Sequence, residues 1–153
     1  MTETESLDKR LVAALCRDAR ADVCDIAAAT DAVPTTVQKR LRVLEDTGVI
    51  GGYAARIDYG SLGYESVVFR LGVGLGAVDA VTDRLRDRPE FTTVYQTSGT
   101  ENVFAIGRFE DAAAVAACLH ELHDDPDTQT VEMDRIVSVH GENGCPIPDG
   151  DAD

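Results

Sequence analysis

The stretch Pro34–Leu44 (PTTVQKRLRVL) combines residue types that bind DNA. Its cations are Lys39, Arg40 and Arg42, and it has no acidic residue, although the formal net charge of the 153-residue chain is −14. Lysine and arginine donate hydrogen bonds to guanine edges and to phosphates. A basic stretch in so acidic a chain is therefore a candidate surface for contact with DNA.

A helical projection of this stretch separates an apolar face from a polar one. Val37, Leu41 and Leu44 share the inward face, and hydroxyl, amide and cationic side chains lie outward or on the flanks. Glutamine can pair with adenine, and threonine can contact phosphates or thymine methyl groups. We therefore predict six DNA-binding residues: Thr35, Thr36, Gln38, Lys39, Arg40 and Arg42.

Two interpretations of the same stretch that involve no contact with DNA stay open. Basic residues on the outside of a helix often form only a solvated surface. Thr35 can also cap the helix while Gln38 reaches back to it, as in a capping box. Arg42 has Asp46 four residues later and can be partly neutralised by it, which leaves the other two cations as the stronger candidates.

Helical patterns before the basic stretch predict two helices that can support it. Apolar residues recur at helical spacing in residues 6–19, with Ser6 or Asp8 as the cap. A second, shorter helix is expected over residues 22–30, with Asp22 as its cap.

The next residues predict a tight turn, a third helix and two short strands. Asp31 can adopt the left-handed conformation of a turn, Pro34 suits the first position of a helix, and Gly48 suits the position just after one. Residues 49–59 then indicate two strands around Gly51–Gly52. Three helices with a tight turn and a β-wing describe a winged helix-turn-helix.

The second half of the chain has a different pattern. Strands are expected over residues 66–75, 91–98, 102–109 and 128–139, and helices over 77–88 and 111–124. The order βαββαβ is the ferredoxin-like arrangement, in which both helices cover one face of an antiparallel sheet. Val68 is among the residues of the other face, so this open face is partly apolar and is expected to be an oligomer interface.

The predicted fold class is thus α+β, with a winged helix-turn-helix followed by a ferredoxin-like βαββαβ domain. We predict these boundaries: DNA-binding domain 1–54, connector 55–64, effector and oligomerisation domain 65–140, and an acidic disordered tail 141–153. Residues 1–60 hold 8 bases and 10 acids, net −2, whereas residues 61–153 hold 6 bases and 18 acids, net −12. Such asymmetry indicates two modules with different partners.

Composition also limits the class of protein. No stretch approaches the roughly 18 consecutive apolar residues of a membrane span, and we expect a soluble cytoplasmic protein with no membrane partner. High surface acidity with 12 arginines and only two lysines suits solubility at high salt, which indicates a halophile, with an ordinary acidic protein as the alternative. The four cysteines lack C-x-x-C spacing, and His120 and His123 lack the spacing and third ligand of a metal site, so neither metal nor cofactor is expected.

Residues 7–64 resemble the DNA-binding half of the Lrp/AsnC (feast/famine) transcriptional regulators. The specific segments are R-L-x-x-L-E-x-x-G-V-I-x-G-Y, which starts at Arg40, and the connector L-G-Y, which starts at Leu62. Residues 65–140 are similar to the RAM effector domain of the same family. The resemblance implies a homodimer joined through the RAM sheets and often assembled into octamers, palindromic sites on double-stranded DNA, and a small effector such as an amino acid. A haloarchaeal member is expected.

The chain departs from the family pattern at three positions. Asp31 stands where the family has glycine, and Val33 replaces a capping serine, which makes the Thr35 cap more plausible. The family's G-x-x-D effector motif appears as Gly99, Thr100, Glu101 and Asn102, our candidate effector-binding residues. Because an asparagine offers no carboxylate to an ammonium group, the usual amino-acid ligand is put in doubt.

Two other functions compete with a regulator that performs no catalysis. Siroheme decarboxylases share this architecture, but their chemistry requires a basic or His-lined pocket for a polycarboxylate. The three histidines fall on the second helix of this half and at the end of its last strand, and the half has only six arginines. A module that binds only partner proteins is the other alternative, which an absence of DNA binding would favour.

Overall fold

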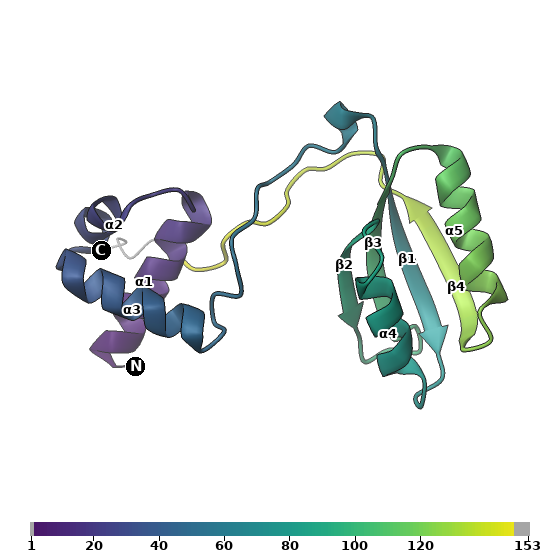
Figure 1. Ribbon diagram of the computed structural model, residues 1–153, viewed down its shortest axis with the longest axis horizontal. Coiled ribbons are helices and arrows are strands. Elements are labelled where there is room, and N and C mark those ends of the chain that lie inside the picture. The colour runs from purple at the N-terminus through teal and green to yellow at the C-terminus, as the bar shows by residue number, and fades with distance from the viewer. Residues whose placement is uncertain (1, 149–153) are drawn as a thin grey trace. The chain divides into compact units, whose positions relative to one another are not determined.

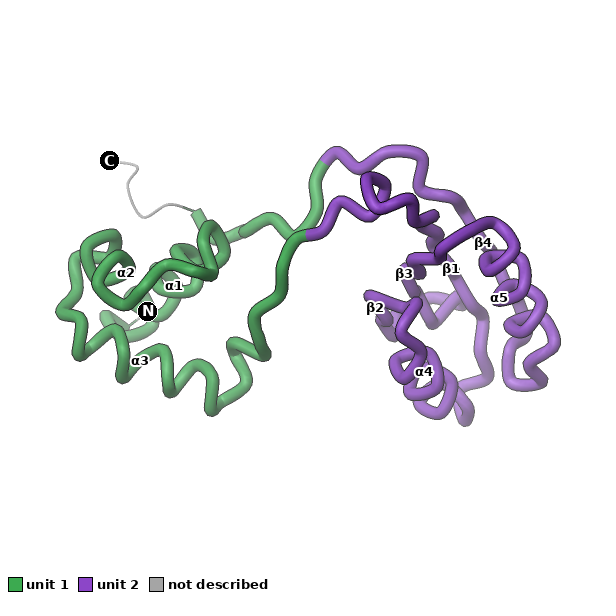
Figure 2. The backbone as a smooth tube through the Cα atoms, turned by 45° about the horizontal axis from the view of Figure 1, so that its top comes forward, with its two compact units in different colours: residues 1–56, 141–153 green, residues 57–140 purple. Residues whose placement is uncertain are grey.

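The computed structural model describes residues 2–148, which form two compact units. The first unit comprises residues 1–56 together with 141–153, and the second comprises residues 57–140 (Figure 2). Each unit has its own hydrophobic core, helical in the first and built on a sheet in the second. None of the described helices is long and apolar enough to cross a membrane.

The first unit contains three helices, α1 (Glu3–Arg17), α2 (Val23–Thr30) and α3 (Pro34–Asp46). Their apolar faces meet in a core of five buried side chains: Leu11, Ile26, Ala27, Val37 and Leu44. The three predicted helices are therefore present. The start of α1 was predicted wrongly, because Thr2 and Glu5 form a capping box there and extend the helix ahead of Ser6.

The turn between α2 and α3 depends on a residue in a left-handed conformation. Asp31 ends α2 with φ 53° and ψ 43°, as predicted for this turn. Pro34 opens α3, and the preceding Val33 is its N-cap without any side-chain hydrogen bond. The predicted Thr35 cap is wrong, because Thr35 already lies inside the first turn and its exposed side chain makes no hydrogen bond to a described residue.

The β-wing predicted after α3 is absent from the described residues. Residues 51–58 form neither helix nor strand. The hydroxyl of Tyr53 instead donates a hydrogen bond of 2.8 Å to Glu45 Oε1 on α3. Strands need a partner for their backbone groups, and within the described chain this segment has none, so the alternation of residue types alone did not produce a hairpin.

The second unit has the predicted βαββαβ order. Its elements are β1 (Glu65–Val73), α4 (Val78–Arg86), β2 (Phe91–Gln96), β3 (Val103–Phe109), α5 (Ala112–Asp124) and β4 (Thr128–Arg135), preceded by the short 3₁₀ helix η1 (Gly60–Leu62). The antiparallel sheet has the order β2-β3-β1-β4, with β1 in register against both β3 and β4. The last strand ends at Arg135, earlier than the predicted residue 139.

Both helices of this unit cover the same face of the sheet (Figure 1). Val67, Phe69 and Leu71 point from β1 into that core and are fully buried. The ring of Phe109 packs edge to face with those of Phe69 and Phe91 at centroid distances of 6.2 Å, and the Phe69 and Phe91 rings are tilted against each other at 5.8 Å. The opposite face has no covering element among the described residues of this unit.

The described residues after position 140 belong to the first unit. Residues 141–148 form no helix or strand, and the clustering of contacts places them with α1, α2 and α3 (Figure 2). The predicted disorder of the segment 141–153 falls in part on residues 149–153, which lie outside the described residues.

Candidate nucleic-acid interface

The outward face of α3 carries five of the six predicted DNA-binding residues. Thr35, Thr36, Gln38, Lys39 and Arg42 are exposed, while Val37 and Leu44 are buried against α1 and α2. Lys39 and Arg42 lie three residues apart, so they project from the same side of the helix. The predicted division of α3 into an apolar and a polar face is confirmed.

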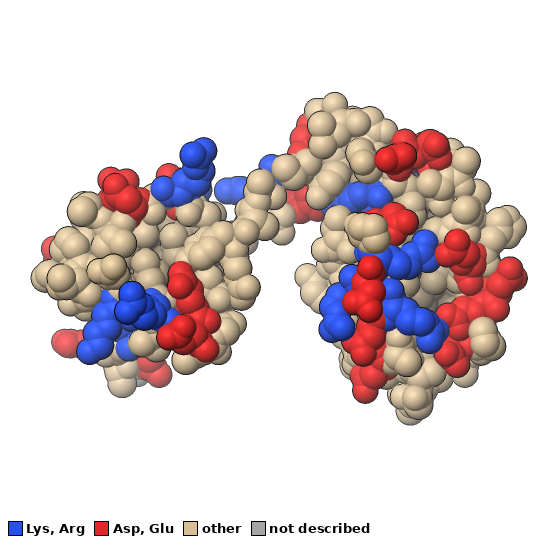
Figure 3. Space-filling view, viewed as in Figure 1, with Lys and Arg blue, Asp and Glu red and all other residues tan. Residues whose placement is uncertain are grey.

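The two exposed cations of α3 are not neutralised by any described residue. Neither Lys39 nor Arg42 makes a hydrogen bond or an ion pair within the described chain, and the predicted compensation of Arg42 by Asp46 is not formed. Figure 3 shows basic atoms gathered over α3, with acidic atoms beside them toward the end of the helix that leads to residue 49. The face can therefore offer unshared positive charge to an approaching anion.

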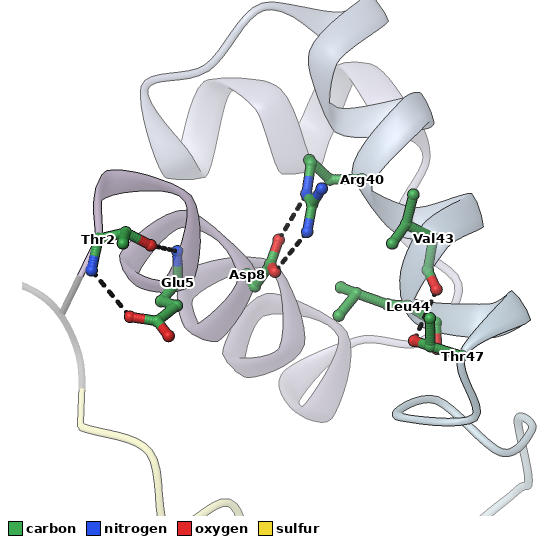
Figure 4. A network of polar contacts seen from close by, with 7 residues as sticks. All are labelled: Thr2, Glu5, Asp8, Arg40, Val43, Leu44 and Thr47. Carbon is green, nitrogen blue, oxygen red and sulfur yellow. Dashed lines mark hydrogen bonds and ion pairs between the residues drawn. The ribbon is translucent and has the colours of Figure 1, made fainter.

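Arg40 differs from its neighbours because α1 holds its side chain. Its Nε and Nη2 atoms donate to the two carboxylate oxygens of Asp8 at 2.9 and 2.7 Å (Figure 4). The side chains are only 24% and 18% exposed, respectively. The hydrogen bond to Asp8 raises the pKa of Arg40. Sequence reasoning ranked Arg40 among the stronger contacts, but its donors already face a carboxylate.

Two other contacts hold the ends of the helices that surround this face. Arg10 Nη1 donates to the carbonyl oxygen of Thr30 at 2.8 Å, which satisfies a carbonyl group at the end of α2. The Thr47 hydroxyl donates to the carbonyl oxygen of Val43 at 2.7 Å and closes the last turn of α3 (Figure 4). The position of α3 is thus fixed by polar contacts as well as by its apolar face.

The four candidate effector residues lie on or beside the turn between β2 and β3. Gly99 and Thr100 are exposed, and Glu101 is half-buried with its carboxylate 3.5 Å from Nε of Arg70. Arg70 also contacts Asp134 at 2.7 Å and Glu132 at 3.1 Å. Hydrogen bonds to these two acids raise the pKa of Arg70. Three carboxylates therefore surround one guanidinium on the open face of the sheet.

Asn102 is buried and takes part in the sheet. Its Oδ1 accepts from the backbone N–H of Val73, and its Nδ2 donates to the carbonyl oxygen of Val73, both at 2.8 Å. The side chain thus pairs with the end of β1 as a neighbouring strand would. Only 7% of the residue is exposed, and one donor and one acceptor of its amide group are already bonded to Val73.

Histidine and cysteine side chains form no catalytic or metal-binding group in the part of the chain that the structure describes. No cluster of three or more His, Cys, Asp or Glu residues suitable for a metal occurs there. His120 and His123 are exposed on α5. Cys118 is buried, and its burial raises the pKa of its thiol to about 11.

Comparison with known proteins agrees with this geometry. The sequence pattern described as winged helix-turn-helix DNA-binding matches residues 5–50. The HTH-type transcriptional regulator LrpA1 of Halobacterium salinarum is 29% identical over 139 residues, which cover 90% of this chain and 92% of that protein. Over nearly its whole length the chain is therefore similar to transcriptional regulators of the Lrp/AsnC type.

Solved structures share the fold of this chain. The leucine response regulatory protein LrpA of Mycobacterium tuberculosis superposes with a TM-score of 0.81 at 24% identity, over 97% of this chain and 100% of that one. The regulator NMB0573 of Neisseria meningitidis, solved as a complex with L-Met, gives a TM-score of 0.77 at 18% identity and covers 93% of each chain. These two structures support the fold, and the curated relatives that match 90% of this chain are named as transcriptional regulators.

The relatives of this chain come from both archaea and bacteria. A haloarchaeal source stays a prediction from composition. The departures from the family pattern have clear structural consequences: Asp31 adopts the left-handed turn conformation, Val33 leaves α3 without a side-chain cap, and Asn102 pairs with Val73. Sequence reasoning missed the roles of Asp8 and Tyr53, whose partners lie 32 and 8 residues away.

Proposed function

We propose that this DNA-binding regulator reads double-stranded DNA with the exposed face of α3. The observation that carries the proposal is the pair of unshared cations, Lys39 and Arg42, on a helix that follows a tight turn. A recognition helix enters the major groove through its N-terminal part, where Thr35, Thr36 and Gln38 are also exposed. Base contacts by these side chains would supply sequence specificity.

High salt weakens phosphate contacts through counterion release. Two or three cations per recognition helix would therefore contribute little affinity in molar salt. We propose that direct base contacts and the simultaneous use of two half-sites support binding there. Two half-sites require two copies of the chain, and an arrangement of the copies with two-fold symmetry would match a palindromic site.

The open face of the sheet is our proposed surface for the second copy. Val68, Phe104 and Ile106 are half-buried on it, and Tyr95 is 59% exposed and stacked on Phe104. An exposed apolar sheet face without a covering layer is a typical oligomer interface. We assign oligomerisation, and assembly beyond the dimer if it occurs, to the second unit and DNA binding to the first.

We also propose that a small effector such as an amino acid binds, but at a residue other than the predicted Asn102. NMB0573 was solved with L-Met, which supports a ligand of that class here. The Asn102 amide is used by Val73, so the carboxylate that would meet an ammonium group is Glu101, which lies next to Arg70. Isothermal titration with amino acids against wild type and Glu101→Gln tests this assignment, and unchanged binding by the variant would contradict it.

The DNA-binding surface is tested by fluorescence anisotropy with a labelled duplex that spans the region upstream of the protein's own gene. Lys39→Ala with Arg42→Ala should weaken binding by roughly 30-fold or more, because each of two good base contacts contributes about 1–3 kcal/mol. Arg84→Ala with Arg86→Ala removes two cations from the second unit and serves as a matched control, which should bind like wild type.

Equal losses in the two double variants would show that the effect is one of net charge and would contradict the assignment to α3. No binding by wild type would reject the DNA-binding proposal for that site. The interface is tested separately with Ile106→Asp, which should convert the dimer to monomers in light scattering. A variant that stays dimeric would place the interface elsewhere.

A further inference from the structure

We infer that Asp8 of α1 is a positioning residue for DNA recognition, and that Arg40 acts through it without touching DNA. This inference rests on the proposed function of α3. The pair joins the second turn of α1 to the middle of α3, and the two residues are 32 positions apart in the sequence (Figure 4). Nothing in the basic character of Arg40 indicates such a role.

The geometry of the pair restricts α3 in a way that apolar packing does not. Two parallel hydrogen bonds, at 2.9 and 2.7 Å, fix both the distance and the relative orientation of a guanidinium and a carboxylate. Val37 and Leu44 set how closely α3 approaches the core, but apolar contacts are non-directional. The Asp8–Arg40 pair therefore adds a directional restraint on the rotation of α3 about its own axis.

That rotation decides where the exposed cations point. Lys39 and Arg42 flank Arg40 in the sequence and project together from the free side of the helix. A turn of α3 about its axis would move both of them, together with Gln38, relative to a DNA groove. The pair thus sets the direction of the side chains that make the contacts.

The same α1 helix also holds the other side of the turn. Arg10, two residues after Asp8, donates to the Thr30 carbonyl group at the end of α2. The turn residue Asp31 follows directly. Neighbouring residues of one helix thus fix the end of α2 and the middle of α3, on either side of the helix-turn-helix turn.

Direct contact of Arg40 with DNA would require breaking this pair. Both carboxylate oxygens of Asp8 accept from Arg40, and both side chains are partly buried. Withdrawal of Arg40 would leave Asp8 without this cation at a surface that approaches phosphates. Partly buried pairs are also screened less by salt than exposed ones, so the orientation of α3 would be retained at high ionic strength.

The inference is tested with a double-mutant cycle of Asp8→Asn and Arg40→Gln, using the upstream duplex and a shuffled duplex over a series of KCl concentrations. Arg42→Gln is the matched control, because it makes the same chemical change on the same helix at an exposed position. Each variant of the pair should weaken binding to the upstream duplex by a similar factor, roughly tenfold, and the double variant by no more than either alone.

The salt dependence separates positioning from contact. Loss of a phosphate contact lowers the slope of log K against log salt by about 0.9. We expect this change for Arg42→Gln and an unchanged slope for both pair variants. Binding to the shuffled duplex should also stay near the wild-type value in the pair variants, since only the direction of the specific contacts is lost.

The contrary result is equally clear. A flatter slope for Arg40→Gln, together with wild-type or tighter binding by Asp8→Asn, would make Arg40 a DNA contact that Asp8 restrains. Circular dichroism checks that each variant is folded, and the swapped pair Asp8→Arg with Arg40→Asp should recover binding where the single variants are unstable. Failure of that swap to recover binding would count against the inference. Wild type that does not bind the upstream duplex would reject the proposed function and this inference with it.

Discussion

In the second unit Arg70, Arg84 and Arg88 each contact at least one carboxylate, whereas Lys39 and Arg42 on α3 contact none in the described chain. Arg86 and Arg135 of the second unit are paired with acids as well. Basic and acidic atoms accordingly alternate over that unit (Figure 3). The acid excess of the chain neutralises arginines where acids are within reach.

The difference shows that the net charge of a chain does not determine the charge of each part of its surface. A chain of −14 can still present unshared positive charge, provided that the acids nearest to it are few or occupied. Two acids near the basic face are occupied: Asp8 of α1 is paired with Arg40, and Glu45 of α3 accepts from Tyr53, whereas Asp46 of α3 is exposed. Three predictions, in decreasing order of effect, test how far the two units differ.

The largest effect is expected in the second unit, at the buried hydrogen bonds between Asn102 and the backbone of Val73. Asn102→Ala leaves the buried N–H and C=O groups of Val73 without their partner. Each such group costs about 1–3 kcal/mol, so the free energy of unfolding should fall by about 2–4 kcal/mol in urea titrations followed by circular dichroism. Thr100→Ala, at an exposed neighbouring position, should change it little; equal losses would show that the turn, and not the Asn102 amide, is responsible.

A smaller effect concerns a thiol in the same core. Burial raises the pKa of Cys118 from 9.0 to about 11, so the folded state retains a proton that the unfolded state loses first. Stability from this group is therefore present below about pH 9 and is lost as the pH rises to about 11.

Wild type should lose about 1–2 kcal/mol more than Cys118→Val between pH 8 and pH 11, since one pKa unit corresponds to about 1.4 kcal/mol. Urea titrations at both pH values measure the difference. Parallel losses in the two proteins would mean that Cys118 titrates as it does in the unfolded chain.

The smallest effect is expected at the edge of the basic face of α3. Asp46→Asn removes an exposed acid four residues after Arg42. DNA affinity should rise by about two- to threefold at low salt, because a like-charge repulsion with phosphate is removed, and the gain should disappear toward 1 M salt. Glu110→Gln makes the same kind of change in the second unit, and an equal gain there would indicate a nonspecific effect of net charge.

Most of the fold could be predicted because the residues that specify it affect the backbone conformation only within a few positions along the chain. Pro34 and Asp31 specify the start of a helix and a left-handed turn, and strand and helix periods gave the βαββαβ order. The β-wing failed because a strand also needs a partner, and the periodicity of residues 49–59 contains no information about one.

For the candidate site, the exposed face of α3 could be predicted, but the contacts that other helices make with α3 could not. The projection of α3 identified the exposed side chains, since a helix has a fixed period. The Asp8–Arg40 pair depends on how two helices pack, and one sequence does not reveal that angle. Part of this contact could be inferred from the sequence. Asp8 and Arg40 carry opposite charges and lie beside the apolar positions Leu11 and Val37 of their helices.

The first unit is assembled from both ends of the chain, residues 1–56 and 141–153. A protease that cuts once after Arg56 would therefore not divide the protein along its structural boundary. One product would hold the three helices, and the other would hold the whole sheet together with the segment that packs with those helices. The two products should co-elute under native conditions and separate only in denaturant, and a label attached within residues 141–148 would report on the helical unit, although the sheet precedes this segment in the sequence.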